Sequence, residues 1–173
     1  MKNLQENIVP STNQNSANVF IHGTTGLRVM FLGNSITKHA PKPEMGWTND
    51  CGMAASCLEK DYVHLFMQKL RAVRPESSFC ITQVAPYEGG FLKREPQELF
   101  AEAAHYDPDI IIGFFGANVD KKYSEKYPPQ SFAAATKKLI DYVNAAGRAK
   151  VFLSGGFHIR PELDLEKMLL CKE

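Results

Sequence analysis

Ser35 and Asn118 each lie in a short loop that follows an apolar run, and both are residue types that acyl transfer requires. Ser35 belongs to Gly33-Asn34-Ser35-Ile36-Thr37 after the run 27–32, and Asn118 to Gly116-Ala117-Asn118 after the run 109–115. A serine hydroxyl can attack a carbonyl, and backbone N–H groups and a side-chain amide can stabilise the oxyanion that forms. These are the parts of an acyl-transfer site, with Ser35 as nucleophile and its own N–H and Asn118 as donors.

Two further loops contribute small and ionisable residues. Glu88, Gly89 and Gly90 follow the run 79–85, and His158 follows residues 151–153. Glycine lets a backbone N–H approach a ligand closely. Gly89 is therefore the candidate for a second backbone donor, with the N–H of Ala85 as its rival, because the intervening proline has no N–H.

Each of these residues also has a purely structural interpretation. Serine after a strand is commonly a helix N-cap, which is the alternative for Ser35. Asn118 could cap a turn, and Gly89-Gly90 could be only a turn. The spacing within the chain does not decide between these roles and catalysis.

The elements that would position these loops alternate between strand and helix. Apolar runs predict strands, amphipathic spacing predicts helices, and Pro or Gly lies at many of their ends. The predicted strands are 27–32, 79–85, 109–115 and 151–153, and the predicted helices are 52–73, 96–105, 129–146 and 161–170. This order predicts an α/β fold with a parallel sheet between two layers of helices. In such sheets the functional residues lie at the carboxyl ends of the strands. Residues 1–25 are predicted to be a polar, extended leader, and 26–173 one domain.

Composition is that of a globular protein and excludes several classes. The 173 residues are 44% hydrophobic and carry a net charge of +1, so no basic field favours nucleic acid. The longest strongly apolar run, 110–115, is too short to cross a membrane, and the N-terminus does not resemble a signal peptide. We therefore expect a cytoplasmic protein that binds neither nucleic acid nor a membrane. The spacing of the four cysteines matches no zinc or thioredoxin motif. We therefore expect no bound metal, and we expect the cysteines to be free thiols.

Together, the loops resemble a known family. Gly33-Asn34-Ser35-Ile36-Thr37 after residues 29–32 is similar to the first block of SGNH hydrolases, also called GDSL esterases/lipases, with Asn34 in place of the namesake Asp. Gly116-Ala117-Asn118 resembles their Gly-x-Asn block, and 52–56 with 59–64 is similar to a bacterial branch. The resemblance implies a flavodoxin-like three-layer fold and a serine ester hydrolase without metal or organic cofactor. It implies small acyl esters as substrates, often acetyl esters of carbohydrates.

The present chain departs from the family's pattern at the catalytic base. That base lies in an Asp-x-x-His segment beyond a fifth strand, and the present chain ends at Glu173, in the predicted helix after the fourth. The resemblance thus predicts a C-terminally truncated domain, with a newly exposed sheet edge that favours self-association. His158, on the correct rim, is the candidate substitute base. His64 in Asp61-Tyr62-Val63-His64 matches the motif literally but falls inside a helix, where a partly exposed, non-catalytic His is expected.

Two functions from different classes follow. The first is a serine ester hydrolase acting through Ser35. The alternative is a catalytically inactive domain that binds a carbohydrate or a protein partner through the same rim. A weaker third option is a flavodoxin-like domain for a flavin or nucleotide, although the chain contains no phosphate-binding glycine motif.

Overall fold

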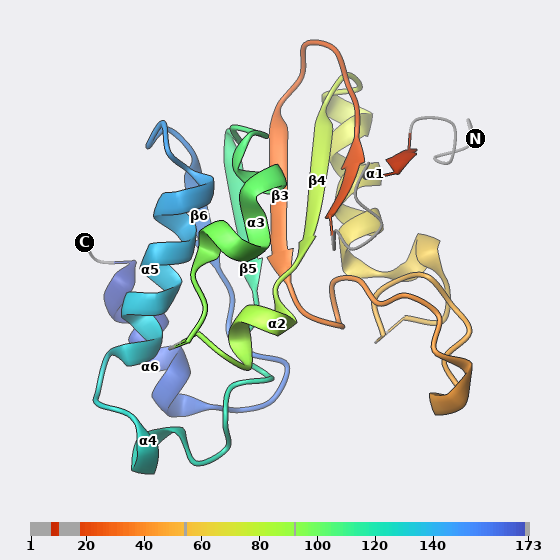
Figure 1. Cartoon of the computed structure of the whole chain (residues 1–173). Coiled ribbons are helices and arrows are strands. Elements are labelled where there is room, and N and C mark those ends of the chain that lie inside the picture. The colour runs from red at the N-terminus through yellow and green to blue at the C-terminus, as the bar shows by residue number, and fades with distance from the viewer. Residues whose placement is uncertain (1–7, 11–17, 54, 92, 172–173) are drawn as a thin grey trace.

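A mostly parallel sheet between layers of helices organises the chain (Figure 1). The structure is a computed structural model and describes residues 8–10, 18–53, 55–91 and 93–171. Within these residues the sheet has six strands in the order β1-β2-β4-β3-β5-β6. The strands are β1 (Ile8–Pro10), β2 (Asn18–Ile21), β3 (Arg28–Gly33), β4 (Ser78–Gln83), β5 (Ile110–Phe114) and β6 (Lys150–Leu153). The helices are α1 (Tyr62–Val73), α2 (Ala85–Glu88), α3 (Pro96–Ala104), α4 (Tyr123–Lys126), α5 (Ser131–Val143) and α6 (Pro161–Leu170), with short 3-10 turns at Pro43–Met45 and Leu58–Lys60.

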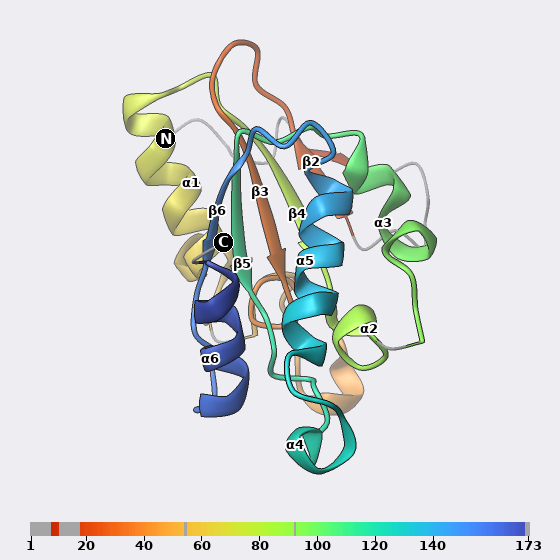
Figure 2. The same ribbon diagram turned by 90° about the vertical axis from the view of Figure 1, so that its left-hand side faces the viewer.

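Alternating side chains of the strands form two apolar layers, one on each face of the sheet. Met30 and Leu32 of β3 belong to the larger core, which α3, α5 and α6 cover. Phe31, between them in sequence, points the opposite way into a smaller core under α1. Figure 2 shows α1 on one side of the sheet and α3 and α5 on the other. The predicted three-layer α/β architecture is therefore confirmed.

The four parallel strands have an order that places the loops. β3 lies between β4 and β5, and β6 follows β5, so the spatial order by chain position is second, first, third, fourth. This order is compatible with a flavodoxin-like fold, in which ligands bind where the crossover direction reverses, between the first and third strands. The carboxyl ends of β3 and β5 are at that point.

The N-terminal leader differs from the prediction. Asn18–Ile21 forms β2, which pairs antiparallel with β4 and buries Ile21 in the core under α1. The apolar run Val19-Phe20-Ile21 is short and stands among polar residues, and it was not predicted as a strand. The helix predicted from residue 52 begins at Tyr62, because Asp61 caps it through the N–H of His64. Ala85, expected at the end of a strand, and residues 86–88, expected in the following loop, form α2.

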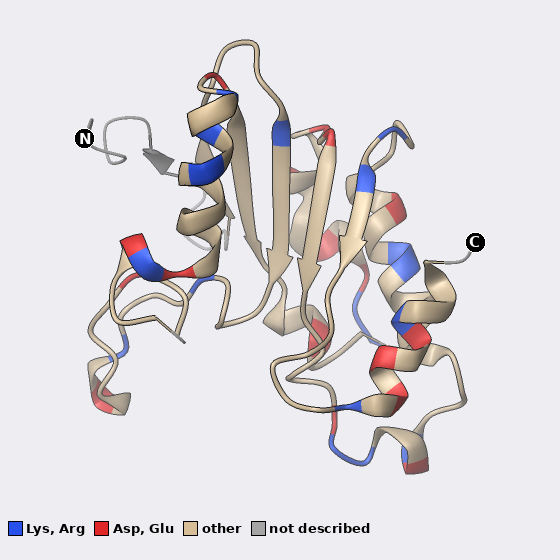
Figure 3. Cartoon of the chain, turned by 180° about the vertical axis from the view of Figure 1, so that it is seen from behind, with Lys and Arg blue, Asp and Glu red and all other residues tan. Residues whose placement is uncertain are grey.

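One strip of the sheet lacks a covering helix within the described residues. Figure 3 shows it between α1 and α6, over β3, β5 and β6. Phe152 of β6 is 57% exposed there, and Phe157 just after the strand is 55% exposed. Charged residues of both signs lie mainly on the helices and loops and form no single-sign face (Figure 3). Exposed apolar side chains therefore lie on this strip and just beyond the end of β6.

Candidate functional site

The loop after β3 leaves Ser35 free. The side chain of Asn34 accepts a hydrogen bond from the N–H of Ile36 (3.1 Å), and its carbonyl accepts from the N–H of Thr37 (2.9 Å). Ser35 is partly buried, and neither its hydroxyl nor its N–H has a hydrogen-bond partner among the described residues. Asn34 therefore caps this turn, and the interpretation of Ser35 as the cap is wrong.

The turn is tight enough to require glycine at its start. A Cβ on Gly33 would lie 1.7 Å from Oγ1 of Thr37 and 3.1 Å from the carbonyl oxygen of Phe114. The next segment packs on the outer side of the turn, where the N–H of Met53 donates to the carbonyl of Ser35 (2.9 Å). Ser35 is thus held from both sides through its backbone while its side chain stays free.

A buried carboxylate joins this loop to the loop that carries Asn118. Glu88, at the end of α2, is 2% exposed. It accepts hydrogen bonds from Nδ2 of Asn34 (3.2 Å) and from Nδ2 of Asn118 (2.6 Å), and also from the N–H of Gly116. The loops after β3, β4 and β5 therefore meet on one side chain. The predicted convergence of Ser35 and Asn118 on one rim is confirmed at the level of their loops.

Glu88 had no predicted role. Its position directly after a predicted strand was visible in the sequence, but a single acidic residue near a turn is usually solvated. Instead, the short helix α2 turns the side chain of Glu88 inward. A signal that could have found it is Asn34, directly after a predicted strand, because a side-chain amide that is buried there needs an acceptor.

The two candidates for a backbone oxyanion donor after β4 are both engaged. The N–H of Gly89 donates to the carbonyl of Ala85 (3.1 Å), continuing α2. The N–H of Ala85 donates to Oε1 of Gln83 (2.6 Å). A role for Gly89 would require the end of α2 to open, whereas the N–H of Ser35 is free in the structure.

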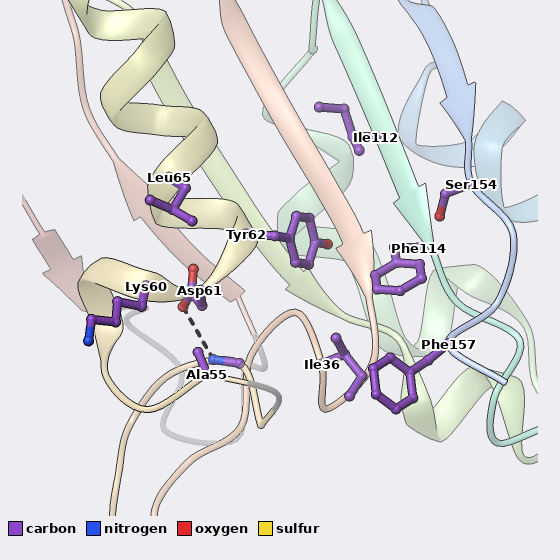
Figure 4. Close-up of a pocket in the computed structure, with 11 residues that line it drawn as sticks. Ile36, Ala55, Lys60, Asp61, Tyr62, Leu65, Ile112, Phe114, Ser154 and Phe157 are labelled. Atoms are coloured by element: carbon purple, nitrogen blue, oxygen red, sulfur yellow. Dashed lines mark hydrogen bonds between the residues drawn. The ribbon is translucent and has the colours of Figure 1, made fainter.

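A cavity of about 540 Å³ lies on the strip of sheet without a helix, and Ile36, the residue after Ser35, and Phe157, the residue before His158, are among the residues that line it. Figure 4 shows Phe157 next to Ile36 at one end of the cavity, and Tyr62 with Asp61 at the other. His158 is exposed, and its ring packs edge-on against Phe157 with centroids 5.2 Å apart. The structure therefore brings the loop of His158 to the same cavity as the loop of Ser35. It places no hydrogen bond between the two side chains within the described residues.

His64 is in a different environment from the one expected. It is 6% exposed rather than partly exposed, and its Nδ1 lies 2.8 Å from each carboxylate oxygen of Asp61. The same carboxylate accepts from the N–H of Gly52 (3.2 Å). Asp61 thus anchors the start of α1 to the segment that packs on the Ser35 turn. The expectation of an exposed helical His is wrong because α1 turns this residue toward the sheet.

The remaining reactive groups form no further centre. Cys80 lies in the core, where burial raises its pKa to about 12, and burial also raises the pKa of Cys51. The cysteines are free thiols. In the described part of the chain, no group of three or more His, Cys, Asp or Glu side chains could hold a metal ion.

Comparisons with known proteins give no match. No family model, no curated protein and no solved structure is similar to this chain. Over the residues described, no helix has the length and apolar character needed to cross a membrane.

Proposed function

We propose that the chain is a serine ester hydrolase of SGNH type that acts on small acyl esters, such as acetyl esters of carbohydrates, through Ser35. The observation that carries the proposal is that the hydroxyl and N–H of Ser35 have no hydrogen-bond partner among the described residues, in a loop joined through Glu88 to the amide of Asn118. The location supports it, because ligands of such sheets bind at the strand ends where the crossover direction reverses.

In the proposed reaction, Oγ of Ser35 forms a bond to the ester carbonyl carbon and gives its proton to a base. The N–H of Ser35 and the amide of Asn118 donate to the oxyanion. The carbon–oxygen bond to the alcohol then breaks, and the alcohol leaves with that proton. Water attacks the acyl-serine in the same way, which releases the acid and restores the hydroxyl.

His158 is the proposed proton acceptor. It lies on the loop after β6, beside the cavity that the Ser35 loop also lines, and the ring is exposed. A shift of this loop across the cavity would bring the imidazole to the serine, and a general base must come within hydrogen-bond distance of the proton it removes. The cavity itself would accept the acyl group, since Ile36 and Phe114 give it an apolar wall.

Hydrolysis of p-nitrophenyl acetate by the wild type and by Ser35→Ala tests the proposal. We expect Ser35→Ala to lose at least about 100-fold in kcat/KM, because the nucleophile is removed. Ser154→Ala is the matched control, since this serine lines the same cavity but its hydroxyl donates to the carbonyl of Gly113 (3.2 Å). Equal rates for wild type and Ser35→Ala would refute the role of Ser35.

His158→Gln separates the base from the nucleophile. Loss of turnover in this variant, with Ser35-dependent turnover in the wild type, supports the base. Retention of full turnover removes His158 from the mechanism and leaves Ser35 in it. If the folded wild type shows no Ser35-dependent turnover but binds acetylated oligosaccharides in calorimetry, the alternative of a non-catalytic binding domain replaces the enzyme.

A further inference from the structure

Lys167 of α6 is a buried cation next to the rim. Its side chain is 5% exposed, and its Nζ donates to the carbonyl of Phe115 (2.8 Å) and to that of Ser154 (3.0 Å). These carbonyls belong to the residues directly after β5 and β6. Lys167 therefore joins the ends of two strands, as Glu88 joins three loops on the neighbouring strands.

The two ionisable groups lie on either side of one peptide. The N–H of Gly116 donates to Glu88, and a Cβ on Gly116 would lie 3.5 Å from Nζ of Lys167. Gly116 has a φ of +122°, which favours glycine at this position. Burial lowers the pKa of Lys167, and the carboxylates of Asp164 and Glu88 oppose that shift. The ammonium of Lys167 and the carboxylate of Glu88 thus interact across Gly116, which precedes Ala117 and Asn118.

A carboxylate can only accept hydrogen bonds, so it fixes the orientation of an amide that faces it. Nδ2 of Asn118 must point at Glu88, and one of its two N–H groups is used there. The second N–H remains for a ligand. The same rule fixes Asn34, whose Nδ2 faces Glu88 while its Oδ1 holds the turn around Ser35.

This arrangement has an electrostatic cost for the reaction proposed above. An ionised Glu88 within hydrogen-bond distance of an oxyanion donor repels the negative charge that develops on the substrate, more strongly in a buried site than in water. A cation on the opposite side of Gly116 offsets that repulsion. The orienting carboxylate and the compensating ammonium would then act as a pair.

We propose that Glu88 and Lys167 are positioning residues of the proposed esterase: Glu88 orients Asn118 toward the oxyanion, and Lys167 offsets the charge of Glu88. The inference rests on the proposed function. It names Asn118 as the group through which both residues act, and neither residue touches the substrate.

The test compares Glu88→Gln, Lys167→Met and the double variant in p-nitrophenyl acetate hydrolysis. We expect each single change to lower kcat by roughly 10- to 100-fold with little change in KM, because the interaction that they support forms in the transition state. The double variant removes both charges and is expected to be more active than Lys167→Met alone. Such non-additivity indicates that the two residues act on one another.

Glu166→Gln is the matched control for folding. Glu166 is a buried carboxylate on the same helix, but its hydrogen bonds are to other groups: it accepts from the N–H groups of Gln130 and Ala133 and from the hydroxyl of Tyr123. We expect this variant to lower the midpoint of urea unfolding without changing kcat of the folded protein. The side-chain amide resonances of Asn118 should shift in Glu88→Gln and not in Glu166→Gln.

The outcomes separate the two proposals. If turnover depends on Ser35 but kcat is unchanged in folded Glu88→Gln and Lys167→Met, the positioning inference is wrong and the esterase stands. If the folded wild type has no Ser35-dependent turnover, the esterase is wrong and the inference falls with it. A kcat loss in Glu166→Gln equal to that in Glu88→Gln would also overturn it, since the effect would then be one of stability alone.

Discussion

Substitution of Gly52 by alanine tests how the Ser35 turn is held. A Cβ at this position would lie 2.1 Å from the carbonyl oxygen of Ile36 and 3.4 Å from Cβ of Asp61. The first atom is backbone, so it cannot rotate away as a flexible side chain could. The segment around Gly52 must therefore move away from the turn.

That movement would break two hydrogen bonds, from the N–H of Met53 to the carbonyl of Ser35 and from the N–H of Gly52 to Asp61. Each contributes about 1 kcal/mol, and forcing an extra methyl into a packed site costs about 2 kcal/mol. Replacing glycine by alanine restricts the unfolded chain and offsets about 1 kcal/mol. We expect the free energy of unfolding to fall by about 3 kcal/mol.

Urea unfolding followed by circular dichroism measures this loss, with Gly89→Ala as the matched control. A Cβ on Gly89 would meet its nearest atom, the carbonyl oxygen of Ala85, at 3.7 Å, and the φ of Gly89 is −71°. We expect this control to be as stable as the wild type or slightly more so. If Gly52→Ala unfolds at the same urea concentration as Gly89→Ala, the contact between its segment and the Ser35 turn is refuted.

Three further predictions concern ionisation, thiol reactivity and association. Burial raises the pKa of Tyr62 and of Tyr87 to about 12, whereas these hydroxyls ionise near 10 in an unfolded chain, so stability should fall as pH rises from 10 to 12. In an absorbance titration of the folded protein, ionisation of all six tyrosines near pH 10 would contradict this. Burial also raises the pKa of Cys80 to about 12, while Cys171 is exposed. Iodoacetamide labelling of the native protein, followed by mass spectrometry, should therefore modify Cys171 before Cys80. Equal labelling of the two cysteines would contradict the burial of Cys80. Phe152 is exposed on β6, which is an edge strand of the described sheet. Sedimentation should therefore show concentration-dependent association, and Phe152→Lys should reduce it. A wild type that is monomeric at all concentrations would refute this.

The strands and helices were predictable where one physical signal dominated. The apolar run before Gly113 predicted β5. The apolar spacing of Phe132, Leu139 and Val143 predicted α5, and these three side chains are buried. The same reasoning fails for Val73, whose spacing from Phe66 and Leu70 predicts a place on the inner face of α1 but which is 69% exposed. It lies in the last turn of α1, where the helix reaches its end and no longer packs on the sheet.

The site was predictable in its loops and not in its contacts. Ser35 and Asn118 were identified because each follows a strand, which is a property of the chain order. The inward turn of Glu88 depends on how three loops pack together, and no pattern along one loop contains that information. Likewise, β2 forms because β4 offers it an edge, so a three-residue apolar run among polar residues becomes a strand through its partner.

Glu88 also accounts for asparagine at position 34, where the family that the motif resembles has its namesake aspartate. Nδ2 of Asn34 donates to Glu88 at 3.2 Å while Oδ1 accepts from the N–H of Ile36. An aspartate could still cap the turn, but its second oxygen would face a buried carboxylate, and two such groups cannot both be ionised at that separation. An amide can donate to Glu88 and accept from the turn at once without any change of protonation. The identity of residue 34 and the burial of Glu88 are therefore a single feature, and the orientation of Asn118 follows from it.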